Sequence, residues 1–147
     1  MVKETLRLHA IAPLLVPDES MEACIVLGYR IPTKTCLIVN AWDIGRDPVV
    51  WGDDALAFKP ERFMQGGRNR DIDLKGQNFE LIPFGSGRRG CPGMALGLDI
   101  VGLALAQLFY CFDWSLECRD GVQRELNMSE EFGMTMPPCF HLFAIQF

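Results

Sequence analysis

The cysteine at position 91 has neighbours whose types and spacing suit metal chemistry. It follows residues 84–90, which read FGSGRRG, and Pro92-Gly93 after it open a long apolar stretch. A cysteine at the start of a helix faces free backbone N–H groups and the positive end of the helix dipole, both of which attract an anionic sulfur. Gly85 and Gly87 let the loop adopt conformations that are closed to other residues. The run therefore favours a thiolate at Cys91, which is the form of cysteine that binds metals.

A structural interpretation competes with this one, because most free cysteines are small buried hydrophobes. The spacing separates the two interpretations. The chain matches the pattern F-x-x-G-x-R-x-C-x-G at all five fixed positions, which are Phe84, Gly87, Arg89, Cys91 and Gly93. A chance match in a chain of this length has a probability on the order of 10⁻⁵. Through this run the chain resembles the cytochrome P-450 family of haem-thiolate monooxygenases.

The resemblance implies a role for each residue of the pattern. Cys91 would be the axial thiolate ligand of the iron in haem b, the cofactor with which this family activates dioxygen. Arg89 would pair with a haem propionate. Gly93 would let the helix approach the flat macrocycle, and Phe84 and Gly87 would complete the cofactor-binding loop. No catalytic residue is expected in this chain beyond the iron ligand.

Two weaker motifs lie outside residues 84–93, the run that we call the cysteine loop. Glu4 and Arg7 are three residues apart on an expected helix, and such a pair is usually a solvated one worth about 0.3 kcal/mol. Residues 58–63 read FKPERF, and the simplest interpretation of Arg62 in that run is an arginine in a surface loop. The resemblance instead implies that Glu4, Arg7 and Arg62 form one buried network. Removing one member should cost about 3–5 kcal/mol, because a charge is then left buried without its partner.

Nearly the whole chain fits the resemblance, and plant-type members are the best match. The implied fold is mainly α-helical with small antiparallel β sheets, and residues 1–147 would form its C-terminal haem-binding portion without an internal boundary. The implied activity is monooxygenation, in which one atom of dioxygen enters a small apolar substrate of plant secondary metabolism. Electrons would come from NADPH through a partner reductase. The full-length family form would lie at the cytosolic face of the endoplasmic reticulum membrane.

The resemblance also places two apolar segments on the substrate side of the haem. The residues concerned are Ile11, Ala12, Pro13, Leu14 and, near the C-terminus, Cys139. Both segments are equally well explained as apolar turns in the core, and the sequence leaves the two interpretations open.

The largest departure from the family concerns what precedes Met1. We expect the family's membrane anchor and its oxygen-activating helix in upstream residues, so this chain alone is not expected to oxidise a substrate. The alternative is a truncated, non-catalytic remnant with weak or no haem binding. A smaller departure is Asp18, where many relatives carry a basic residue. An acid at this position would repel a haem propionate unless its side chain points to solvent.

The elements that position these residues follow from helix breakers and from hydrophobic spacing. Residues 4–9 are expected to end a helix, and Asn40 is expected to cap a short helix that runs to Ile44. Residues 23–27 and 35–39 are expected to pair as strands of one small sheet. Prolines and glycines between 47 and 63 leave room only for turns and single helical turns. Residues 65–77 are expected to form an exposed, mobile loop that is a poor place for chemistry.

The C-terminal part is expected to contain a long helix and two strands. Residues 93–112 are apolar nearly all round and are therefore predicted to form a buried helix. Residues 114–118 and 141–147 read as strands. The longest apolar stretch, 94–109, contains Asp99 and Gln107 and falls short of the ~20 residues that a membrane span needs. No transmembrane segment is therefore expected, and membrane contact would come only from upstream residues.

Composition excludes several other classes of protein. The chain has 147 residues, 49% of them hydrophobic, and its six cysteines include no Cys-x-x-Cys pair. These features fit a packed globular chain with reduced cysteines better than a disordered or disulfide-linked one. The formal net charge of -5 argues against nucleic acid as a partner, because phosphate binding depends on clustered Lys and Arg.

Overall fold

The computed structural model describes residues 1–116, 118–119, 122–123, 127–140 and 144–146, which divide into two compact units. The first unit comprises Met1–Gly90 with Met134–Met136, and the second comprises Cys91–Gly133 with Pro137–Phe147. The described residues form helices and small two-stranded antiparallel sheets, which confirms the expected fold class. That both units belong to one domain stays a prediction.

The first helix, α1, runs over Val2–Leu8, so the helix expected at residues 4–9 is present. Its buried residues are Glu4, Leu6, Arg7 and Leu8. The next helix, α2, runs over Ala41–Ile44. The Asn40 side chain accepts a hydrogen bond from the Asp43 N–H at 3.1 Å, which confirms the expected cap.

Single helical turns follow, as the sequence predicts for residues 47–63. They are α3 (Pro48–Trp51) and the 3-10 turn η1 (Pro60–Phe63), and a further 3-10 turn, η2 (Gly87–Arg89), precedes the cysteine. α3 begins at a proline, which needs no N–H partner there, and Asp47 caps it by accepting from the Val49 N–H at 2.9 Å. The coil between these turns contributes backbone carbonyls that bind side chains from elsewhere.

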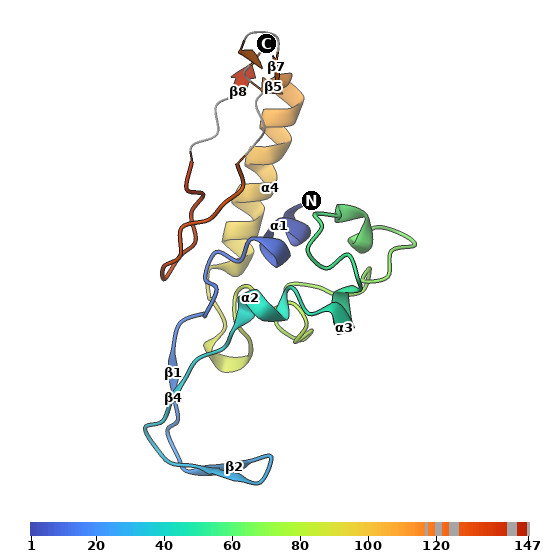
Figure 1. Ribbon diagram of the computed structural model, residues 1–147. Coiled ribbons are helices and arrows are strands. Elements are labelled where there is room, and N and C mark those ends of the chain that lie inside the picture. Colours follow the sequence, from blue (N-terminus) through green and yellow to red (C-terminus); the bar gives the residue numbers. More distant parts are fainter. Residues whose placement is uncertain (117, 120–121, 124–126, 141–143, 147) are drawn as a thin grey trace. The chain divides into compact units, whose positions relative to one another are not determined.

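Two small sheets in the first unit correct the strand pairing that the sequence predicts. The predicted partners contain β2 (Cys24–Val26) and β4 (Cys36–Leu37), but β2 pairs with β3 (Tyr29–Ile31) and β4 pairs with β1 (Asp18–Glu19). The reason is a tight turn. Leu27 and Gly28 have φ of 51° and 85°, so two residues close a hairpin directly after β2. Figure 1 shows β1 and β4 side by side, with the β2 hairpin beyond them.

The loop at residues 65–77 contains no helix or strand, but the prediction that it is exposed is wrong for three of its residues. Asn69, Leu74 and Gly76 are buried. The Asn69 N–H donates to the Arg62 carbonyl at 3.0 Å, and Leu74 is only 7% exposed. Leu74 thereby joins the buried apolar residues of the first unit, which are Leu6, Leu8, Ala10, Ala41, Trp51, Ala55, Leu74, Leu81 and Ile82.

The second unit contains the long helix α4, Met94–Cys111, one residue shorter at each end than the sequence predicts. No residue of α4 is buried among the residues that the structure describes, so the prediction of a buried helix is wrong for this chain. The physical reason is the lack of a covering layer, because the described part of the second unit holds no other helix.

The same helix also corrects the expectation that nothing in the chain has the length of a membrane span. The 18 residues of α4 have a mean hydropathy of 1.7, which meets the length and composition of such a span. A core helix of a soluble protein has similar length and composition, so this match alone is weak support for membrane insertion.

The described residues after α4 contain four short strands. β5 (Trp114–Leu116) pairs antiparallel with β8 (Ala144–Gln146), which confirms strands in the predicted segments 114–118 and 141–147. β6 (Cys118–Arg119) pairs with β7 (Val122–Gln123). Positions 117, 141–143 and 147 of the two predictions lie outside the described residues.

Candidate functional site

Glu4 is the centre of a charged network in the first unit. Arg7 donates two hydrogen bonds to its carboxylate, from Nε to Oε2 at 2.8 Å and from Nη2 to Oε1 at 2.7 Å. Arg62 donates from Nε to Oε1 at 3.1 Å, and the Lys59 backbone N–H donates to the same oxygen at 2.8 Å. The structure thus brings together Glu4, Arg7 and Arg62, although Arg62 is 58 positions from Glu4.

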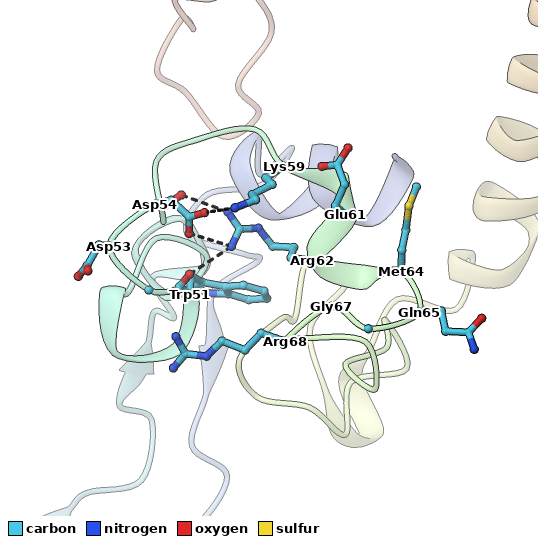
Figure 2. A pocket seen from close by; sticks show the side chains of 12 residues that line it. Trp51, Asp53, Asp54, Lys59, Glu61, Arg62, Met64, Gln65, Gly67 and Arg68 are labelled. Atoms are coloured by element: carbon cyan, nitrogen blue, oxygen red, sulfur yellow. Dashed lines mark hydrogen bonds and ion pairs between the residues drawn. The ribbon is translucent and has the colours of Figure 1, made fainter.

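Arg62 uses its remaining N–H groups on the coil after α3. Its Nη1 donates to the Trp51 carbonyl at 3.1 Å and to Asp54 Oδ1 at 3.3 Å. Its Nη2 donates to the carbonyls of Asp54 at 3.1 Å and Ala57 at 3.3 Å. Figure 2 shows this side chain beside Asp54, which also accepts from Lys59 Nζ at 2.8 Å. A planar guanidinium with five donors suits such a set of acceptors better than an ammonium group.

All three network residues are nearly inaccessible to solvent, with 0% of Glu4, 1% of Arg7 and 6% of Arg62 exposed. Burial by itself raises the pKa of Glu4. Hydrogen bonds from Arg7 and the Lys59 N–H, together with the charges of Arg7 and Arg62, outweigh burial and hold this pKa below its ordinary value. Glu4 is therefore a buried anion that depends on its two cationic partners.

Two residues outside the predicted sites, Gly45 and Trp51, hold Arg7 in place. Trp51 is 1% exposed, and its ring centre lies 5.1 Å from the Arg7 guanidinium carbon. At Gly45, a Cβ would lie 2.4 Å from the Arg7 carbonyl oxygen, so only glycine fits. Arg7 also donates to the carbonyls of Gly45, Ala55 and Ala57. A single glycine or tryptophan in a sequence does not indicate which residue it contacts, so the sequence could not predict that Gly45 and Trp51 contact Arg7.

The loop before the cysteine takes the backbone conformation that its glycines allow. Gly85 and Gly87 have φ of 72° and 68°, in the left-handed region that glycine adopts without strain. The Gly85 N–H donates to the Ile82 carbonyl at 3.0 Å, and the Gly90 N–H donates to the Gly87 carbonyl at 3.2 Å. These turns leave Arg88 and Arg89 exposed.

The 65–77 loop supports the cysteine loop, and the expectation that it is a poor place for chemistry stays a prediction. The Ser86 hydroxyl donates to the Gly76 carbonyl. A Cβ at Gly76 would lie 2.8 Å from the Gly85 carbonyl oxygen, so the two loops approach more closely than a larger residue permits.

Cys91 begins the second unit and precedes α4. Gly93 is the N-cap of α4, and the Met94 N–H donates to the Cys91 carbonyl at 3.4 Å. Cys91 is an exposed free thiol, and its sulfur lies 3.9 Å from the position that a Cβ at Gly93 would occupy. The sulfur therefore lies at the N-terminal end of an 18-residue helix, where free N–H groups attract an anion.

The residues of the cysteine loop fit a haem. Apart from its two chain neighbours, no described residue places a heavy atom within 4 Å of the position that a Cβ at Gly87 would occupy; at Gly93 only the Cys91 sulfur lies within that distance. Each glycine, taken by itself, therefore leaves space beside its backbone that a larger side chain would fill. Arg89 is exposed and offers a guanidinium to a carboxylate, while Phe84 is half-buried.

The residues expected to face substrate differ in exposure. Ile11 is 57% and Leu14 38% exposed, whereas Ala12 is half-buried and Pro13 is fully buried. The Ile11 carbonyl accepts from the Met136 N–H at 3.0 Å, which joins this segment to residues 134–136 of the tail. Cys139 is exposed in the second unit. Of the first segment, Ile11 and Leu14 have the most apolar surface available.

Known proteins resemble this chain along most of its length. It is 51% identical over 145 residues to cytochrome P450 CYP736A12 of Panax ginseng, covering 99% of this chain and 28% of the relative. It is 48% identical over 136 residues to flavonoid 3'-monooxygenase CYP75B137 of Crocosmia x crocosmiiflora, covering 92% of this chain and 26% of the relative. The chain thus spans little more than a quarter of the length of these plant relatives.

Fold comparison and a family model agree with these relatives. A zebrafish cytochrome P450 solved with progesterone matches the chain with a TM-score of 0.76 and 26% identity, covering 99% of this chain and 29% of that structure. The model of the cytochrome P450 family matches residues 1–143. The chain belongs to the cytochrome P450 family.

Proposed function

We propose that the chain is the haem-binding part of a cytochrome P450 monooxygenase and that Cys91 ligates the haem iron. The observation that carries this proposal is the position of the Cys91 sulfur, which is exposed, free and beside Gly93 at the N-terminal end of α4. A haem bound through a cysteine thiolate supplies the activation of dioxygen.

The chain's own residues have separate parts in this proposal. Cys91 binds the iron, and the free N–H groups at the start of α4 stabilise its negative charge. Arg89 pairs with a carboxylate of the macrocycle and orients it. Gly87 and Gly93 permit close approach of the flat ring. The network of Glu4, Arg7 and Arg62 acts by holding α1 to the coil after α3.

A small apolar plant metabolite is the proposed substrate. Support comes from the names of two relatives, desmethyl-deoxy-podophyllotoxin synthase of Sinopodophyllum hexandrum and flavonoid 3'-monooxygenase, and from the exposed apolar surface of Ile11 and Leu14. Electrons would come from NADPH through a reductase at the cytosolic face of the endoplasmic reticulum. This proposal applies to the full-length form of the protein.

The test is optical spectroscopy of the purified chain with added haem, reduced and exposed to carbon monoxide. We expect the Soret band at the position of thiolate ligation and expect Cys91→Ser to remove it. Cys111→Ser is the matched control, because Cys111 is also an exposed free thiol of the second unit, and it should leave the band unchanged. A thiolate band that survives Cys91→Ser contradicts the assignment.

A second proposal is a non-catalytic remnant with weak or no haem binding, and the lack of any fully buried residue in α4 favours it. An apolar helix without a covering layer is typical of an incompletely packed unit. This proposal predicts identical haem spectra for the wild-type chain and Cys91→Ser. The spectroscopic comparison therefore also separates the two proposals.

A further inference from the structure

A hollow in the first unit contains Arg89 together with charged residues to which the proposed iron ligation gives no role. Its walls are formed by Asp18, Glu19, Met21, Arg88 and Arg89. Asp18 and Glu19 form β1, and the arginines end the η2 turn. Two carboxylates and two guanidiniums from distant parts of the sequence therefore face one small volume.

These four charged side chains are all exposed. In the part of the chain that the structure describes, none of them forms an ion pair or a side-chain hydrogen bond. The arginines are thus free to bind an anion, but the hollow that surrounds them already contains an equal number of fixed negative charges. A guanidinium of the hollow attracts the carboxylate of an incoming ligand. A carboxylate of the protein that lies within a Debye length of about 8 Å repels that same ligand.

We propose that Asp18 and Glu19 are fixed counter-charges that weaken the hold of Arg88 and Arg89 on the carboxylates of haem. The inference rests on the proposed function, because Arg89 meets a haem carboxylate only when Cys91 binds the iron. The chain then retains haem less tightly than its cysteine loop alone would permit, and the retention depends on salt. Replacing either acid by its amide removes repulsion without removing an existing bond.

The expected size of the effect follows from the exposure of the hollow. Exposed charge pairs change free energies little, so each of Asp18→Asn and Glu19→Gln should tighten haem binding by about threefold. The double variant should tighten it by about tenfold if the two charges act independently. The gain should shrink in 0.5 M KCl, in which exposed charges are screened within a few ångströms.

The experiment is a titration of the 147-residue chain with two probes, haem and haem dimethyl ester, followed at the Soret band. The ester keeps the iron and the ring but has no free carboxylate. Glu22→Gln is the matched control, since Glu22 is an exposed acid on the same segment and does not line the hollow. Circular dichroism of each variant checks that the fold is unchanged.

The inference is supported by tighter haem binding in Asp18→Asn and Glu19→Gln, with unchanged affinity for the ester and no gain in Glu22→Gln. Equal haem affinity in the wild type and the double variant overturns it, as does an equal gain for the ester. Failure of the proposed function has a different signature. In that case Cys91→Ser binds both probes as the wild type does, and the premise of the inference is lost with it.

Discussion

The two units of the chain differ in which side chains they bury. In the first unit, the charged residues Glu4 and Arg7 are 0% and 1% exposed. In the second, the apolar residues Leu103 and Phe109 of α4 are 62% and 61% exposed. Burial therefore follows the availability of partners more closely than the polarity of the residue, because paired charges satisfy one another while an apolar helix needs a covering layer.

This difference separates stability from chemistry. The first unit is tied together by hydrogen bonds from two arginines to Glu4 and to backbone carbonyls. The proposed iron ligand, Cys91, belongs to the unit whose long helix is uncovered. Substitutions in the network should therefore change folding, whereas substitutions on α4 should change it little.

The largest effect is expected for Glu4→Ala. This substitution leaves Arg7 and Arg62 buried without their shared anion, so the free energy of unfolding should fall by about 3–5 kcal/mol. Urea unfolding followed by far-ultraviolet circular dichroism measures the change.

The matched control is Asp54→Ala, which removes the exposed acidic partner of the same Arg62. It should change the unfolding midpoint far less than Glu4→Ala does, because water replaces an exposed partner readily. Equal loss in both variants would show that burial of the network does not determine its contribution.

Acid should destabilise the first unit through Glu4. Its pKa in the folded chain lies below the ordinary value of 4.5, so the folded state binds this proton more weakly than the unfolded state. The resulting stability is complete above pH 4.5 and is lost as the pH falls through the lowered value. Unfolding free energies measured between about pH 6 and 3 should fall in the wild type and should be flatter in Glu4→Gln. Identical profiles would contradict this origin.

A smaller effect is expected from the glycines of the cysteine loop. Gly87 has φ of 68°, so Gly87→Ala should cost about 1–2 kcal/mol of unfolding free energy through backbone strain alone. Gly93→Ala is the comparison variant, because Gly93 has φ of -88° and a Cβ there would meet only the Cys91 sulfur, at an ordinary contact distance of 3.9 Å. It should be close to neutral in unfolding while weakening haem binding. A neutral Gly87→Ala would remove the argument from backbone conformation.

The smallest effect is expected on α4. Leu103→Gln should change the unfolding free energy by no more than about 0.5 kcal/mol, since Leu103 loses little burial. It should also reduce binding of a hydrophobic dye to the chain. A loss of several kcal/mol would show that this face is covered in solution, and the contrast between the two units would fail.

The sequence predicts those features that depend on local spacing. The Asn40 cap, the single turns between 47 and 63 and the extent of α4 all follow from residues close together in the chain. The network of Glu4, Arg7 and Arg62 is predicted only through the family resemblance, because no local pattern in the sequence connects Arg62 with Glu4. The predicted strand partners are wrong because Leu27-Gly28 is a weak signal for a two-residue turn.

Contacts between distant segments account for the remaining differences. The approach of Gly76 to Gly85 and of Gly45 to Arg7 depends on backbones far apart in sequence, and a lone glycine does not identify its neighbour. The exposure of α4 also could not be predicted from local pattern. Apolar composition indicates that a helix is stable when other elements cover it, but it does not show whether those elements are present.

The most direct test of iron ligation by Cys91 is electron paramagnetic resonance of the chain loaded with ferric haem. The wild type should give the low-spin signal of thiolate ligation. Cys91→His should replace this signal with that of imidazole ligation, because the new side chain offers nitrogen at the same position. A thiolate signal that persists in Cys91→His would mean that another cysteine binds the iron, and it would contradict the assignment.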